Sequence, residues 1–280
     1  MKRAPLVPAV ILSLLGGLPM AAREAHPKGP DTDKRPWVTR TFQIVGNHST
    51  MYLTMSYPEP RPDGSVDGEV AYGFTDGDKY NAWEPGRNPI VYHVSYPFRG
   101  HFWQGVFGDV EFHLELARRT PYTDQELADR ARARKVQVHP YPQGDADDLR
   151  WNALMQKPWD SIDDVLHLWQ ESVRMGNQDQ HASNAPEDRQ LGDMPVVRTD
   201  FGVPCVQILR TRSEGGPKDD RQYYFLFEPD YQIELNIELV DGSDRPGLAK
   251  SDWRPRAEAI ADKILQSVKV RVEPMSGSGH

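Results

Sequence analysis

Cysteine is almost absent from this chain of 280 residues, which contains Cys205 alone. A single cysteine cannot form an internal disulfide. The surrounding residues, 203–209, have the composition of a β-strand, where cysteine often behaves as a small buried hydrophobe. We therefore expect a structural Cys205 and a fold stabilised by an ordinary hydrophobic core, for which the length suffices in one large domain or two small ones.

The compact motifs that identify many enzymes are also missing. The sequence contains no Gly-x-Ser-x-Gly elbow, no phosphate-binding loop, no His-Glu-x-x-His helix and no cysteine pair for zinc. A catalytic site assembled from distant residues is still compatible with these absences. The sequence therefore favours a protein that binds over one that catalyses, and we expect no cofactor.

Long apolar runs are absent except for one near the first residue. Residues 4–18 carry no charge, follow two basic residues and precede a pair of alanines. This order is typical of a secretory signal peptide, and the run is short for a membrane span. We predict a signal peptide over 1–22, a periplasmic mature protein and no membrane span after cleavage. An uncleaved anchor is the alternative, because the residues three positions before either cleavage point are not small.

The chain has fewer basic than acidic residues. The chain has 33 Lys and Arg against 41 Asp and Glu, a net charge of −8, and loss of the two basic residues of the leader would make it −10. Repulsion by phosphates disfavours a nucleic-acid partner. Opposite fields favour a basic protein partner. Solubility alone is the other explanation of the acidic charge.

The remaining chain is predicted to form one folded region between two polar ends. Residues 23–35 are polar and contain two prolines, which is typical of a flexible leader. A single α+β domain is expected over 36–273, with a possible subdivision near 120–200. Residues 274–280 are expected to be a disordered tail.

Alternating apolar residues and turn signals predict many strands. The predicted strands are 38–45 and 51–57 as a hairpin, 69–74, 90–96, 101–116 with a break near Gly105 or Gly108, 203–212, 222–228, 231–239 and an edge strand over 269–272. The strand 231–239 alternates strictly, which predicts one face on the core and one in water.

Helical spacing and capping residues predict three helices. They are expected over 123–135, from the capping box of Ser161 and Asp164 to Gly176, and from Ser251 to about 268. Residues 176–195 show no periodicity and are expected to be a long loop. The sum is an α+β fold, an antiparallel sheet with helices packed on one face.

Three histidines are the nearest approach to a metal site. His93, His101 and His113 lie on neighbouring predicted strands, where two of them could meet as ligands together with Glu111 or Glu115. Ordinary histidines on a sheet surface are the alternative interpretation.

Acidic residues suggest three further sites, for each of which a simpler interpretation is preferred. Residues 76–78 and 145–148 resemble parts of calcium loops but lack the remaining ligands, so we expect solvated turns. Glu234 and Glu238 share one strand face but are about 13 Å apart along the strand, too far for joint acid–base chemistry. A solubilising outer face is the preferred interpretation.

Aromatic residues crowd one region and predict a surface for a protein partner. A turn that combines aromatic side chains with arginine is typical of a contact patch. The candidate partner-binding residues are Trp83, Tyr96, Phe98, Arg99, Phe102 and Trp103.

The C-terminal third resembles the ending of PsbP-like α+β proteins. The resemblance is carried by Tyr223–Phe227, by Tyr231–Leu239 and by Trp253–Val270 with its Ile-x-x-Ser pattern. It implies two long strands that lead into a last helix and a short closing strand. The same ending is seen in bacterial envelope proteins, including immunity proteins that neutralise toxins delivered by type VI secretion. The shared positions are structural, so no functional residue is carried over.

Together these features predict a periplasmic binding or inhibitor protein, most sharply an immunity protein. Loops near Trp83, Trp103 and 176–195 would occlude the active site of a basic toxin. One alternative is a periplasmic hydrolase, which needs His93 or His113 near an acid and a nucleophile in one cleft. Another is a general envelope-maintenance protein.

Overall fold

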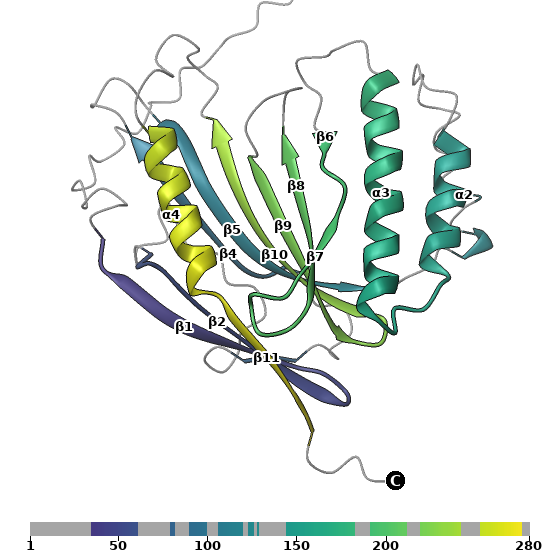
Figure 1. Ribbon diagram of the computed structural model, residues 1–280, viewed down its shortest axis with the longest axis horizontal. Helices are drawn as coiled ribbons and strands as arrows, with labels where there is room; N and C mark the ends of the chain where they lie inside the picture. The colour runs from purple at the N-terminus through teal and green to yellow at the C-terminus, as the bar shows by residue number, and fades with distance from the viewer. Residues whose placement is uncertain are drawn as a thin grey trace, which may run out of the picture. The chain divides into compact units, whose positions relative to one another are not determined.

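A computed structural model describes most of the chain from residue 35 onward. The described residues are 35–60, 79–81, 90–99, 106–119, 123–125, 128, 144–182, 191–211, 219–241 and 253–275. Within them the chain forms two β-sheets and the helices α2, α3 and α4 (Figure 1).

The smaller sheet is built around an N-terminal hairpin. Its strand order is β11-β2-β1-β3, formed by β1 (Trp37–Val45), β2 (Ser49–Pro58), β3 (Lys79–Asn81) and β11 (Lys269–Pro274). β1 and β2 pair antiparallel, which confirms the predicted hairpin. β3 runs parallel to β1, and β11 returns from the far end of the chain to pair with β2 as the edge strand.

The larger sheet is antiparallel throughout. Its strand order is β4-β5-β10-β9-β8-β6, with β7 also paired to β8. The strands are β4 (Ile90–Arg99), β5 (Val106–Arg118), β6 (Leu191–Gly192), β7 (Val196–Arg198), β8 (Cys205–Thr211), β9 (Asp220–Glu228) and β10 (Tyr231–Asp241). β5 and β10 pair along their lengths, from Tyr231 opposite Arg118 to Asp241 opposite Gly108.

The main hydrophobic core lies on one face of the larger sheet. Alternate residues of β4, β5, β9 and β10 pack there against the apolar side chains of β1 and β2 and against α4 (Trp253–Ser267). The predicted apolar stripe of this helix is confirmed, because it buries Trp253, Ala257, Ile260, Ala261 and Ile264.

A second core lies on the opposite face of the same sheet. Successive side chains of a strand point to opposite faces. Val206 and Tyr224 therefore point away from the main core and meet Val165 and Leu168 of α3 (Ile162–Ala182). α2 (Gly144–Met155) packs beside α3, as Figure 1 shows. The α+β class is confirmed, but helices cover both faces of the larger sheet, where the sequence predicted one.

α3 is longer than predicted. Its capping box is confirmed, since the amide of Ser161 donates to Asp164 Oδ2 at 2.9 Å. The helix then passes through Gly176 and ends at Ala182. Asn177 explains the continuation, because its side-chain amide bonds both backbone groups of Gly192, at 2.8 and 2.9 Å. These bonds fix the helix against β6 and offset the cost of an internal glycine, about 1 kcal/mol.

α2 was not predicted as a helix. Residues 145–148, which were expected to form a solvated turn, lie in its first turns. Its apolar pattern is weak, because Leu149 is 58% exposed while the polar Asn152 is buried. Helical periodicity in the sequence could not reveal such an element.

β5 is continuous through Gly108, where the sequence allowed a break. The ring of Trp253 occupies the space that a Cβ at this position would fill. Gly108 therefore reflects close packing by α4 and does not interrupt the strand. β9 likewise begins at Asp220, two residues earlier than predicted, because this residue pairs with both flanking strands.

Several predictions lie outside the described residues. They are the signal peptide and most of the leader, the strand 69–74, the turn 76–78, residues 101–105, most of the helix 123–135 and residues 276–280. Pro274, where the tail was expected to begin, belongs to β11.

One carboxylate of the larger sheet binds the hairpin turn of the smaller sheet. Glu228, at the end of β9, accepts hydrogen bonds from the backbone amides of Asn47, His48 and Ser49 at 3.0, 2.7 and 2.7 Å. The Ser49 hydroxyl donates a fourth bond at 3.0 Å. The turn of the β1–β2 hairpin is thus closed around a charge from the larger sheet. Gly46 is required beside it, because a Cβ there would overlap the Glu228 carboxylate.

Replacing this carboxylate tests its role in stability. We expect Glu228→Ala to lower the free energy of unfolding by about 2–4 kcal/mol, because three backbone donors lose a charged acceptor. Urea-induced unfolding measures this change. Glu59→Ala, at an exposed position of the same chain, serves as the control and should differ little from wild type. Equal stabilities of the two variants would contradict the assignment.

Candidate functional site

The polar face of the larger sheet carries most of the ionisable side chains that the described strands bring together. Core residues such as Leu235 and Ile237 point to the other face, so their neighbours Glu234, Asn236 and Glu238 lie on this one. The strand register arranges the polar side chains in three rows. We call this side of the sheet the carboxylate face, and α3 covers part of it, because Trp169 stacks on Tyr224. Its rows are Ser95, Glu111, Glu238 and Asp220; His93, His113, Asn236 and Gln222; and Glu115, Glu234 and Tyr224.

Like charges face one another across the strands of this face. Glu234 is directly opposite Glu115, and Glu238 is opposite Glu111 on one side and Asp220 on the other. Directly opposed side chains have Cβ atoms about 5 Å apart, and like charges at that spacing destabilise a sheet. A protonated carboxyl or a nearby cation relieves such repulsion.

Glu234 is the carboxyl most perturbed in this arrangement. Burial, followed by the charges of Glu115 and Asp220, raises the pKa of Glu234 to about 7, against the smaller effects of Tyr224 and Arg210. Burial also raises the pKa of Glu115. The face therefore contains a carboxyl that changes charge near neutral pH, as is common at functional sites.

Two of the three predicted histidines meet on this face. His93 and His113 are directly opposite, with ring centroids 5.5 Å apart. His93 Nε2 lies 3.5 Å from Glu111 Oε2. Burial, and secondly the nearby His93, lower the pKa of His113. His101 lies outside the described residues, and within them no three His, Cys, Asp or Glu side chains are placed to hold a metal ion.

Two buried amides border the carboxylates. Asn236 is only 7% exposed, and its Oδ1 atom has no hydrogen-bond partner. Gln232 is fully buried; its Oε1 accepts a bond from Trp169 Nε1 of α3 at 2.9 Å, while its Nε2 has no partner. An unsatisfied buried polar group costs about 1–3 kcal/mol. Such groups mark positions where a bound polar group would add stability.

The sequence had predicted only part of this face. Alternation correctly placed Glu234 and Glu238 on the polar side of β10. It also suggested a simple solvated surface, which is wrong for Asn236 and Gln232. The cross-strand partners Glu115 and Glu111 were missed, because the pairing of strands more than a hundred residues apart leaves no local signal.

The predicted aromatic surface is only partly described. Tyr96 is fully buried, donates from its hydroxyl to the carbonyl oxygen of Pro58 at 2.5 Å and belongs to the main core together with Phe98, which is 4% exposed. Neither side chain is therefore available on the surface, because both point into the space between the sheets. Trp83, Phe102, Trp103 and the side chain of Arg99 lie outside the described residues.

Cys205 is buried, as the sequence predicted. Burial raises the pKa of its thiol to about 12, so the reactive thiolate is scarce at neutral pH.

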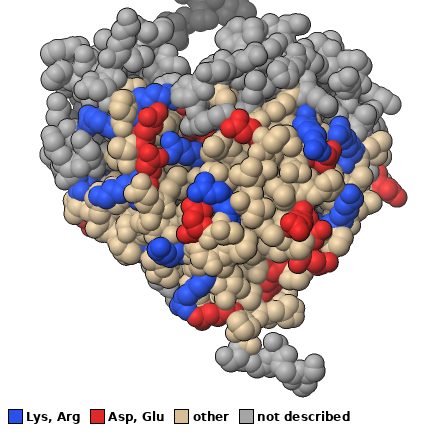
Figure 2. All heavy atoms as spheres, viewed as in Figure 1, with Lys and Arg blue, Asp and Glu red and all other residues tan. Residues whose placement is uncertain are grey.

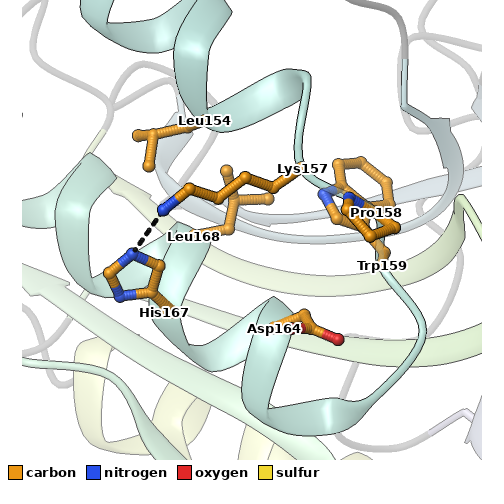
Figure 3. Close-up of a pocket in the computed structure, with 7 residues that line it drawn as sticks. All are labelled: Leu154, Lys157, Pro158, Trp159, Asp164, His167 and Leu168. Carbon is orange, nitrogen blue, oxygen red and sulfur yellow. Dashed lines mark hydrogen bonds between the residues drawn. The ribbon is translucent and has the colours of Figure 1, made fainter.

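A small pocket lies where α2 leads into α3. It is lined by Leu154, Lys157, Pro158, Trp159, Asp164, His167 and Leu168, with Lys157 Nζ 3.4 Å from His167 Nε2 (Figure 3). Its space suits about one ordered water molecule, which is too little for a metabolite.

On the surface seen in Figure 2, Lys and Arg lie among Asp and Glu, as on an ordinary solvated surface.

Comparison of the chain with protein-family models, with curated proteins and with solved structures finds no match. Of the helices in the described part of the chain, none has the length and apolar character that crossing a bilayer requires.

The perturbed carboxyl predicts a pH-dependent stability. Glu234 has a higher pKa in the folded protein than the ordinary value of about 4.3, so the folded state binds this proton more tightly. Stability is therefore lost as pH rises from about 4 through 7. We expect Glu234→Gln to gain about 1–3 kcal/mol relative to wild type between pH 4 and pH 8.

Urea unfolding at several pH values measures this difference. Glu59→Gln is the matched control, and its difference from wild type should stay constant with pH. His113 makes an opposite contribution to the pH dependence of stability. Because it is present in wild type and variant alike, this contribution cancels when the two are compared at each pH. A constant difference for Glu234→Gln would refute the raised pKa.

Proposed function

We propose that this protein is an exported binding or inhibitor protein that recognises a basic protein partner. More specifically, we propose a periplasmic immunity protein that occludes a secreted antibacterial toxin. The carboxylate face is the observation that carries this proposal, since it opposes like charges on neighbouring strands.

Like charges placed close together on the carboxylate face repel one another. Two ionised carboxylates repel by about 3 kcal/mol at 5 Å and an effective dielectric constant near 20, and by less where the side chains turn apart. Glu111, Glu238 and Asp220 form three neighbours in one row, with Arg210 opposite Asp220 at its end. A cationic side chain from a partner would add attraction to this row of carboxylates.

The overall charge supports the same kind of partner. The chain carries a net charge of −8, and a field of one sign accelerates the encounter with an oppositely charged protein. The N-terminal apolar run and the PsbP-like ending add support for an envelope protein. Binding over the carboxylate face would act by covering the partner's functional surface without chemical change.

Co-purification with the product of the neighbouring gene tests this function. We expect the double variant Glu111→Gln, Glu238→Gln to bind such a partner at least tenfold more weakly, because two charges are lost from one row. The affinity should also fall as salt concentration rises. Isothermal titration calorimetry measures both effects.

Glu59→Gln is the control and should bind as wild type does. Unchanged affinity of the double variant would remove the carboxylate face from the interaction. A neighbouring gene unrelated to toxins, together with no salt-dependent partner, would contradict the immunity function.

A periplasmic hydrolase is the second candidate. The observation that favours it is the pKa of Glu234, about 7, on the same face as Glu115 and the pair His93 and His113. A protonated carboxyl near an ionised one is the usual arrangement of a general acid and its partner. Chromogenic ester, peptide and glycoside substrates test this candidate; hydrolysis that Glu234→Gln abolishes and Glu59→Gln preserves would support it over binding alone.

A further inference from the structure

We propose that the centre of the carboxylate face binds a guanidinium group, presented by an arginine side chain of the basic partner. This inference rests on the proposed function and specifies which group the face recognises. Asn236, with its buried and unpartnered Oδ1, stands at the centre of the site, between the row of Glu234 and the row of Glu238.

Asn236 lies where a positively charged hydrogen-bond donor would be favoured. It lies opposite His113 on β5 and Gln222 on β9, and Glu234 and Glu238 flank it two residues away on the same strand face. Its side chain is 7% exposed, so an unsatisfied oxygen there lowers stability. A donor that arrives with a ligand would satisfy it, and the surrounding carboxylates favour a donor with positive charge.

The spacing of the rows is the second argument, and it separates arginine from lysine. Adjacent rows are about 7 Å apart along a strand. An ammonium donates all its bonds from one nitrogen, so two of its acceptors lie at most about 6 Å apart. A guanidinium donates from separate nitrogens in a planar fork and spans a larger gap. Because the rows are separated along the backbone by this distance, a guanidinium is the cationic group better suited to donate both to Asn236 Oδ1 and to a carboxylate of the Glu115–Glu234 pair.

The charge state of Glu234 supplies an independent readout. A bound cation favours the ionised carboxylate, so binding near pH 7 should release a proton from this residue. The groups that act on Glu234 are Glu115 from β5, Asp220 and Tyr224 from β9 and Arg210 from β8. The charges of Glu115 and Asp220 raise the pKa of Glu234, and a bound guanidinium would lower it.

The experiment uses a small probe and the full chain. Nα-acetyl-L-arginine amide and Nα-acetyl-L-lysine amide are titrated into the protein at pH 7, by calorimetry in two buffers of different ionisation enthalpy. We expect the arginine probe to bind at least fivefold more tightly than the lysine probe and to release part of a proton per site.

Three variants complete the experiment. Asn236→Ala and, independently, Glu115→Gln should each weaken arginine binding at least fivefold, so that a folding defect in one leaves the other informative. Glu59→Gln should bind the probe as wild type does.

The outcomes distinguish this inference from the proposed function. Equal binding of the two probes, or an arginine probe that both site variants bind as wild type does, would overturn the guanidinium site. The proposed function would stand in that case if the double variant Glu111→Gln, Glu238→Gln still lost affinity for the basic partner. Conversely, probe binding without any effect of that double variant on the partner would remove the carboxylate face from the interaction with the partner, and with it the assignment of the guanidinium to a partner.

Discussion

β5 and β10 are paired from Tyr231 opposite Arg118 to Asp241 opposite Gly108, and the two faces of the larger sheet follow from that register. Ile233, Leu235, Ile237 and Leu239 enter the main core only while β10 keeps its position against β5. A shift of one residue would bring the intervening carboxylates into the core. The burial of apolar side chains on one face therefore fixes the positions of the charged residues on the other face.

This coupling explains how unfavourable charges can persist on a folded surface. These glutamates sit on strands that the core holds in place, so their backbones cannot move apart without disturbing buried side chains. A rigid array of this kind loses little conformational entropy when it binds a partner. A cationic partner above these carboxylates would reduce their mutual repulsion, which is the basis of the function we propose.

The sequence predicted the features that depend on local pattern. The hairpin, the capping box at Ser161, the buried stripe of α4 and the burial of Cys205 all follow from spacing along a short segment. Features that depend on distant residues were missed. The continuation of α3 past Gly176 depends on Asn177 and Gly192, and the continuity of β5 at Gly108 depends on Trp253.

The candidate site was likewise predicted only where it depends on local pattern. Alternation placed Glu234 and Glu238 on one face, but only the register adds Glu115 and Glu111 and encloses Asn236. The aromatic residues gave the opposite result: Tyr96 and Phe98 looked suited to a surface because a turn follows them, yet they fill the space between two sheets. A turn in the sequence does not determine which way the preceding side chains point.

The closure of the smaller sheet by β11 also constrains how the molecule folds. Its hairpin lies near the start of the described chain, whereas the strand that completes it, Lys269–Pro274, comes close to the end. Contacts of such high sequence separation slow folding, since a very long loop must close before they form. The smaller sheet can therefore be completed only after nearly all of the chain has been synthesised, so during most of synthesis its β1–β2 hairpin lacks the edge strand that covers β2.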